Sequence, residues 1–201
     1  MTSTVDQAVV ALQAGELAIV PTDTVYGLVA SADSEVSARK LSRAKGRDHD
    51  QPIALLAADL DVLLACVPEL RGRAGAIAGA LLPGPYTLVL PNPSRRYRWL
   101  TGSRPDTIGI RIPAFEGLGY ELLGRVGALA GTSANLAGGP DPHTLEEVPV
   151  ELRAAAGAVV DGGALLGTPS TVLDFTGAEP RVLRHGAGPV AEALRIVASV
   201  L

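Results

Sequence analysis

The chain has 201 residues, of which 47% are hydrophobic and only 3% aromatic, and its formal net charge is −4. This composition supports a core of aliphatic side chains and excludes a chain that is disordered throughout. The acidic balance argues against a protein coated with basic surface for nucleic acid, but it leaves room for a local basic pocket. The single Cys66 cannot form an internal disulfide, and the sequence has neither a membrane-spanning apolar run nor a secretory signal, so we expect a cytoplasmic protein.

The predicted elements alternate between helix and strand from the first residues onward. Thr4 and Gln7 have the spacing of a capping box ahead of a helical pattern that Gly15 ends. Further patterns predict strands at residues 17–20, 53–57 and 86–90, and helices at residues 34–45, 59–67 and 68–82. The polar stretch at residues 92–105 is predicted to be a mobile loop because it is rich in Arg and Pro.

The second half of the chain repeats this alternation. Strands are predicted at residues 107–112, 128–130, 158–160, 171–175 and 181–183, and helices at residues 115–126, 144–156 and from 189 to the C-terminus. Thr144 and Glu147 have capping-box spacing for the second of these helices. The last two strands are expected to form a hairpin. The chain therefore predicts an α/β fold, with helices flanking a twisted sheet of parallel and antiparallel strands, in a single domain of residues 1–201.

The most informative segment is Pro21-Thr22-Asp23-Thr24-Val25-Tyr26-Gly27-Leu28. It follows a buried strand, which the proline ends because it cannot donate to a sheet ladder. Short polar side chains then bond nearby backbone groups and hold a loop in one shape. Ligands of α/β proteins bind at such loops, although an ordinary strand-to-helix turn accounts for this pattern equally well.

Two pairs of polar residues have the same spacing in different loops. Lys45 and Arg47 stand at i and i+2 at a helix end, so both charges can converge on one anion, or simply complement the helix dipole. Ser133 and Asn135 repeat this spacing after another strand, where they can donate to phosphate oxygens or form a turn.

Arg111 is a cation within an apolar strand, Ile110-Arg111-Ile112. A half-buried guanidinium needs a carboxylate or phosphate partner, which either a ligand or a structural ion pair would supply. The sequence has no zinc-ligand spacing, no P-loop and no nucleophile elbow, so we assign no metal site to protein side chains.

Taken in chain order, eight short motifs resemble those of the YrdC-like family, in its short, single-domain threonylcarbamoyl-AMP synthase form. They are Pro21 to Leu28, Lys45-Gly46-Arg47, Leu82 to Leu88, Thr107 to Pro113, Thr132 to Asn135, Asp161-Gly162-Gly163, Ser170 to Asp174 and Leu183 to Gly186. The resemblance covers roughly residues 17–188, and we expect the extra C-terminal domain of longer relatives to be absent. It implies a YrdC-like fold with a large concave cationic cleft.

The resemblance also implies an activity, that of a nucleotidyltransferase making L-threonylcarbamoyl-AMP and pyrophosphate from L-threonine, bicarbonate and ATP, with Mg²⁺. A separate threonylcarbamoyl transferase complex would then modify tRNA, with which this chain would have at most a weak contact. By the same resemblance, Lys45 and Arg47 are the catalytic cations. The implied ATP-binding residues are Lys45, Arg47, Thr107, Ser133, Asn135 and Arg184, and the implied threonine-binding residues are Thr24, Arg111 and Ser170.

Three residues depart from the family's usual pattern, namely Asp48, Ala137 and Asp141. An aspartate near phosphates is unfavourable unless it reaches a magnesium ion or turns to solvent, so neither aspartate is assigned to the site.

Two alternatives to the synthase function remain. One is an RNA-binding module of the tRNA-modification pathway, which the scarcity of aromatic residues disfavours. The other is a carbamoyl-transfer domain like that of hydrogenase-maturation proteins, whose additional segments this chain lacks.

Overall fold

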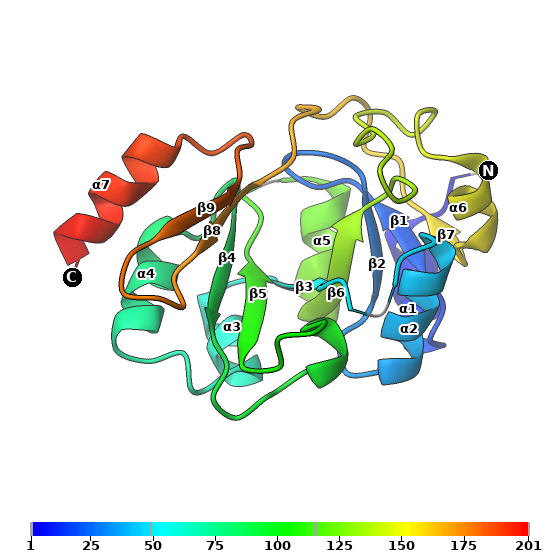
Figure 1. Ribbon diagram of the computed structural model, residues 1–201. Coiled ribbons are helices and arrows are strands. Elements are labelled where there is room, and N and C mark those ends of the chain that lie inside the picture. The colour runs from blue at the N-terminus through cyan, green and yellow to red at the C-terminus, as the bar shows by residue number, and fades with distance from the viewer. Residues whose placement is uncertain (1, 49, 115, 201) are drawn as a thin grey trace.

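The computed structural model describes residues 2–48, 50–114 and 116–200. Their strands form one mixed sheet in the order β7-β1-β2-β6-β3-β5-β4-β8-β9 (Figure 1). The pairs β1–β7, β3–β5 and β4–β8 are parallel, and the other neighbours are antiparallel. The strands are β1 Ala18–Val20, β2 Gly27–Ser31, β3 Ala54–Ala57, β4 Tyr86–Pro91, β5 Thr107–Arg111, β6 Ala128–Ser133, β7 Ala158–Val159, β8 Thr171–Asp174 and β9 Arg181–Arg184.

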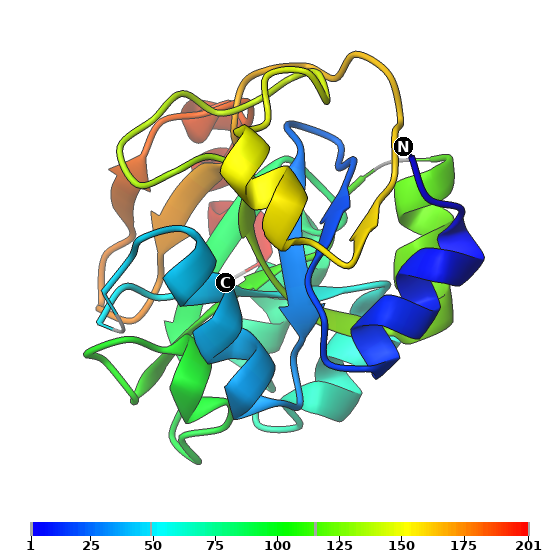
Figure 2. The same ribbon diagram turned by 90° about the vertical axis from the view of Figure 1, so that its right-hand side faces the viewer.

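Helices pack on both faces of this sheet, and Figure 2 shows α1 and α5 side by side on one of them. The helices are α1 Val5–Gln13, α2 Glu35–Ala44, α3 Leu60–Cys66, α4 Arg73–Leu81, α5 Leu118–Val126, α6 Val150–Ala155 and α7 Val190–Val200, with a short 3₁₀ turn at Arg98–Leu100. The predicted fold class, a mixed sheet flanked by helices, is therefore confirmed. None of the helices in the described part of the chain has the length and apolarity that crossing a bilayer requires.

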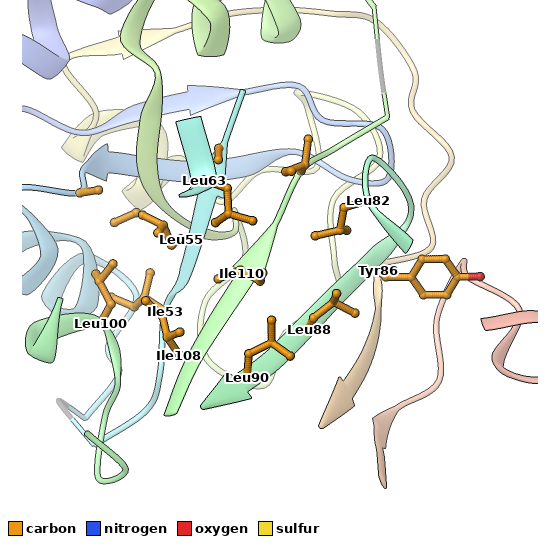
Figure 3. Close-up of a cluster of buried hydrophobic side chains, with 14 of the residues drawn as sticks. Ile53, Leu55, Leu63, Leu82, Tyr86, Leu88, Leu90, Leu100, Ile108 and Ile110 are labelled. Atoms are coloured by element: carbon orange, nitrogen blue, oxygen red, sulfur yellow. The ribbon is translucent and has the colours of Figure 1, made fainter. Parts of the chain in front are cut away.

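The core divides into two clusters because successive side chains of a strand point to opposite faces. Ala18 and Val20 of β1 pack with α1 and α5, whereas Ile19 belongs to the larger cluster on the other face. Figure 3 shows part of that larger cluster, in which Leu88 of β4 lies opposite Ile110 of β5 in the sheet register. Burying these aliphatic side chains fixes which face of each strand remains free for a ligand.

Several predicted boundaries are confirmed by local chemistry. Thr4 and Gln7 form the capping box of α1, and Gly15 follows it with a φ of +78°. Ser34 caps α2 through a bond from the Ser37 amide, and Asp59 caps α3. The hairpin between β8 and β9 is antiparallel, as predicted.

Strand β2 was not predicted, because its sequence, Gly-Leu-Val-Ala-Ser, has no alternation of polar and apolar residues. Its four leading residues are buried between β1 and β6, and such a strand lacks the pattern of a half-exposed one. Residues 21–26 consequently join two strands, so the alternative interpretation of this segment as a strand-to-helix turn is wrong.

Two predicted helices are shorter than expected. The helix expected at residues 68–82 begins at Arg73, since Gly72 adopts a φ of +57° that breaks the helical path. The capping box at Thr144 and Glu147 is wrong, and α6 begins only after Pro149. A helix starting at residue 145 would place that proline where its ring meets the carbonyl four residues earlier. The expected start of α5 at Phe115 lies outside the described residues.

The stretch at residues 92–105, expected to be a mobile loop, is anchored at several points. The amide group of Asn92 donates to the carbonyls of Arg96 and Pro105, at 2.9 and 3.2 Å. The indole of Trp99 donates to the Ala32 carbonyl at 2.8 Å, and Leu100 is buried. The loop therefore has a defined path beside the sheet.

Candidate functional site

A cavity of about 620 Å³ lies over the sheet face opposite the larger core cluster. Alternation along the strands places residues 88, 90, 108 and 110 in the core, and leaves Thr87, Gly109 and Arg111 facing the cavity. The volume is within the range of pockets that bind small molecules. Its described lining residues include five cations, which are Lys45, Arg47, Arg104, Arg111 and Arg184. They include a single carboxylate, that of Asp141.

The two polar pairs that the sequence separates by almost ninety residues meet at this cavity. Lys45, the C-terminal cap of α2, donates through Nζ to Oδ1 of Asn135 at 2.9 Å and to the carbonyl of Ser133. The Ser133 hydroxyl lies 2.6 Å from the same amide oxygen, and the Asn135 amide group donates to the Gly139 carbonyl at 2.7 Å. Gly46, with a φ of +64°, turns the chain immediately after Lys45.

Burial changes the protonation of this lysine. Lys45 is 3% exposed, and desolvation, followed by the nearby charge of Arg47, lowers the pKa of its ammonium group to about 7. The partners that the structure gives Lys45 are neutral oxygens, with Asp141 acting only as a weaker, more distant charge. An anion entering the cavity would therefore favour the charged form of Lys45.

Arg47 lies beside this cluster and is held by two neutral groups. Its Nε donates to Gln51 at 2.5 Å, and Nη1 donates to the Thr132 hydroxyl at 3.2 Å. Burial and the charge of Arg184 both lower the pKa of the Arg47 guanidinium. Two arginines that repel each other across a cavity attract a polyanion between them.

Arg111 forms a structural ion pair and also lines the cavity. Its Nη2 donates to the carboxylate of Asp23 and to the Thr24 hydroxyl, the latter at 2.8 Å, so it forms a buried ion pair. Burial lowers the pKa of Arg111, and Asp23 opposes that shift. Arg111 also lines the cavity, and its buried Nε has no hydrogen-bond partner in the part of the chain that the structure describes.

The three expected threonine-binding residues differ in their access to the cavity. Ser170 and Arg111 line it, whereas Thr24 is fully buried and is bonded to Arg111 and Thr22. The Ser170 hydroxyl lies 2.8 Å from that of Thr87 and accepts from Arg184 at 3.1 Å. The structure thus brings Arg184 and Ser170 together at the cavity. Thr24 is not among the described lining residues and lies behind Arg111.

Thr107 also lines the cavity, and its hydroxyl donates to the carbonyl of Arg104 at 3.1 Å. Of the three residues that depart from the family's usual pattern, Asp48 is exposed and is not among the residues that line the cavity, whereas Ala137 and Asp141 line it.

The described residues contain no group of three His, Cys, Asp or Glu side chains that would hold a metal ion. With Asp141 as the available carboxylate, a magnesium ion would enter bound mainly to the phosphates of a nucleotide.

Sequence reasoning missed several residues of this site. Asp23 was seen only as part of a polar loop, although its charge beside an embedded arginine was the available signal. Thr87 was included only as part of the motif Leu82 to Leu88, and Arg104 only as part of the expected mobile loop. Tyr26, whose hydroxyl lies 2.9 Å from both Asp161 and the Gly163 carbonyl, explains why Asp161-Gly162-Gly163 lies beside the 21–26 loop.

Comparison with known proteins gives a consistent result. The family Sua5/YciO/YrdC, described as "Telomere recombination", matches residues 10–186. A threonylcarbamoyl-AMP synthase of Pyrococcus abyssi is 34% identical over 94% of this chain, which spans 56% of that relative. A putative threonylcarbamoyl-AMP synthase of Mycobacterium tuberculosis is 35% identical over 96% of this chain and 90% of its own length. The crystal structure of P. abyssi Sua5 complexed with L-threonine has a TM-score of 0.88 at 33% identity, covering 98% of this chain and 58% of that one.

Proposed function

Because the chain belongs to the Sua5/YciO/YrdC family, we propose that it converts L-threonine, bicarbonate and ATP into L-threonylcarbamoyl-AMP and pyrophosphate. The observation that carries the proposal is the cavity, whose described lining residues include five cations and a single carboxylate on a chain whose net charge is −4. Such a concentration of positive charge suits a triphosphate and a carboxylate bound together. The similarity to synthases of this name supports the same reaction.

The reaction proceeds in two steps. The threonine amine condenses with bicarbonate, losing water, to give a carbamate. A carbamate oxygen then attacks the α-phosphorus of ATP, and the bond to pyrophosphate breaks. Transfer of this kind requires alignment of the reactants and neutralisation of charge more than a nucleophilic side chain. A magnesium ion accompanying ATP would supply further neutralisation on the phosphates.

In the proposed arrangement, Lys45 and Arg47 neutralise the phosphate charge that develops during transfer. Ser133 and Asn135 support Lys45 through the bonds at its ammonium group, and Thr107 and Arg184 complete the ATP contacts. ATP binding draws Lys45 into its charged form, since a nearby anion raises the pKa that burial has lowered. The cavity also shields the unstable carbamate from water.

For threonine, we propose that Arg111 binds the carboxylate and Ser170 contacts the hydroxyl. The unpartnered Nε of Arg111 supports this role, because a buried donor is stabilised by an acceptor that a ligand brings. Thr24 would act through Arg111, whose guanidinium it helps to orient. Bicarbonate would bind beside the threonine amine before the nucleotide step.

We further propose a single domain of residues 1–201 in the cytoplasm, whose product serves a transferase complex that modifies tRNA. An RNA-binding module is less well supported, because no aromatic side chain is among the described residues that line the cavity. The direct experiment is mass spectrometry of the product formed from ¹³C-bicarbonate. Appearance of labelled threonylcarbamoyl-AMP supports the proposal, and consumption of ATP to AMP alone contradicts it.

A further inference from the structure

Arg104 differs from the other cavity cations in how weakly the protein holds its side chain. Lys45, Arg47, Arg111 and Arg184 each make a side-chain hydrogen bond of 2.9 Å or shorter. The contacts of Arg104 are longer, at 3.4 Å to Asp174 and 3.2 Å to Thr176. Its side chain is 46% exposed, although it lines the cavity.

The carboxylate that Arg104 approaches is already satisfied by other groups. Oδ2 of Asp174 accepts from Arg181 at 2.6 Å, and Oδ1 accepts from the amide and hydroxyl of Thr176 at 2.9 and 2.6 Å. Desolvation raises the pKa of this buried carboxyl, but the hydrogen bonds from Thr176, from Arg181 and, last in order of size, from Arg104 outweigh it and hold the pKa at about 2. Asp174 therefore keeps its shorter bonds from Thr176 and Arg181 when Arg104 turns away, and the charge of Arg104 is available to a ligand.

The backbone of Arg104, by contrast, is held in place beside Thr107, one of the residues proposed to bind ATP. Its carbonyl accepts from the amide and the hydroxyl of Thr107, both at 3.1 Å. The preceding Ser103 donates to the carbonyl of Asp50 at 3.2 Å. Gly102 has a φ of +60°, and a Cβ there would lie 2.3 Å from that same oxygen, so only glycine permits this approach. The Arg104 side chain thus extends from a rigid turn that adjoins the loop bearing Arg47.

We propose that Arg104 binds the β- and γ-phosphates of ATP, the part that leaves as pyrophosphate. The inference rests on the proposed function. Arg111 is committed to Asp23 and the threonine carboxylate, and Lys45 and Arg47 serve the phosphate that reacts. The terminal phosphates carry the largest remaining charge, and a guanidinium can bind two of their oxygens at once. Arg104 exchanges its long contact with Asp174 for these oxygens.

The test compares Arg104→Ala with Arg181→Ala, its matched control. Both variants remove an arginine from Asp174, but Arg181 is not among the described cavity-lining residues. Dissociation constants for ATP, AMP and threonine are measured by calorimetry and by displacement of labelled ATP. We expect Arg104→Ala to weaken ATP binding by about ten- to a hundredfold, the scale of a charge-assisted hydrogen bond, with AMP and threonine changed less than about twofold. Arg181→Ala should change none of the three by more than about twofold.

Three results would overturn the inference: unchanged ATP affinity in Arg104→Ala, an equal loss for ATP and AMP, or the same loss in Arg181→Ala. The last would mean that Arg104 acts only by supporting Asp174. If the unmodified protein binds no ATP, the proposed function fails, and the role of Arg104 fails with it. If the unmodified protein binds ATP and Arg104→Ala binds it equally well, only the role of Arg104 fails.

Discussion

The ammonium group of Lys45 lies 2.9 Å from the amide oxygen of Asn135, so the end of α2 and the loop after β6 form one polar cluster. The same oxygen lies 2.6 Å from the Ser133 hydroxyl. A lysine held in this way by neutral oxygens has its position fixed while its charge stays uncompensated. This relationship is the basis for the role we propose for Lys45 in phosphate binding.

Replacing either cation of this cluster should reduce turnover without unfolding the protein. Lys45→Ala and Arg47→Ala are each expected to slow pyrophosphate release by roughly two to three orders of magnitude, as is usual when one transition-state charge stabiliser is lost. Lys40→Ala is the control, because Lys40 pairs with Glu16 outside the cavity. Circular dichroism verifies folding. Near-normal turnover in both cavity variants would remove Lys45 and Arg47 from the site.

The pH dependence of ATP binding should depend on Lys45. Its ammonium form prevails below the pKa of about 7, and its neutral amine prevails above it. Lys45→Arg keeps the positive charge throughout this range. Because both proteins share the titration of ATP itself, the ratio of their affinities isolates Lys45. Calorimetry at pH values from about 6 to 8 should show the unmodified protein losing ATP affinity relative to the variant as pH rises. A constant ratio would mean that the charge state of Lys45 does not change.

Local spacing alone predicted this cluster as two separate pairs, and only the family resemblance placed all four residues at one ATP site. The spacing of Lys45 with Arg47, and of Ser133 with Asn135, indicated convergence within each loop, but not that β2–β6 pairing would bring the loops together. That information resides in long-range strand order, which local periodicity does not encode. The starts of α1, α2 and α3 were predicted well because a helix cap depends on neighbouring residues, whereas the capping box expected at Thr144 was wrong. Strand β2 was missed because full burial removes the alternation that marks a strand.

The ion pair between Arg111 and Asp23 should contribute to stability as well as to ligand binding. Both side chains are less than 10% exposed, so Arg111→Ala leaves a buried carboxylate unpaired. We expect a loss of about 3–5 kcal/mol in the free energy of unfolding, measured with urea. Arg111→Lys should retain most of the stability yet weaken threonine binding, with ATP affinity little changed, because lysine lacks the planar fork. Unchanged threonine affinity in Arg111→Lys would leave Arg111 a purely structural role.

Amino-acid selectivity should depend more on the hydroxyl of threonine than on its methyl. A missing methyl changes binding by only about 1–3 kcal/mol, whereas a site that hydrogen-bonds a hydroxyl discriminates strongly against its absence. Serine should therefore be a poor substrate and valine a worse one in pyrophosphate-release assays. Ser170→Ala should narrow the difference between threonine and valine, since Ser170 lines the cavity. Valine turning over as well as serine would show that the hydroxyl is not recognised.

Tyr26 should stabilise the loops around the cavity through its hydroxyl. This oxygen lies 2.9 Å from Asp161 and accepts from the Gly162 amide at 2.9 Å, and burial raises the pKa of the phenol to about 12. Tyr26→Phe keeps the ring and removes these bonds, so unfolding free energy should fall by about 1–3 kcal/mol in urea titrations. Equal stability of Tyr26→Phe and the unmodified protein would contradict this role.

The central claim is that this cavity joins threonine, bicarbonate and ATP in one reaction. It is tested most directly by measuring pyrophosphate release with all three substrates, and then with threonine and bicarbonate each omitted in turn. We predict rapid release with the complete set and only background release when either is left out, in protein freed of dissolved carbon dioxide. Release that continues at the same rate without threonine or without bicarbonate would contradict the account.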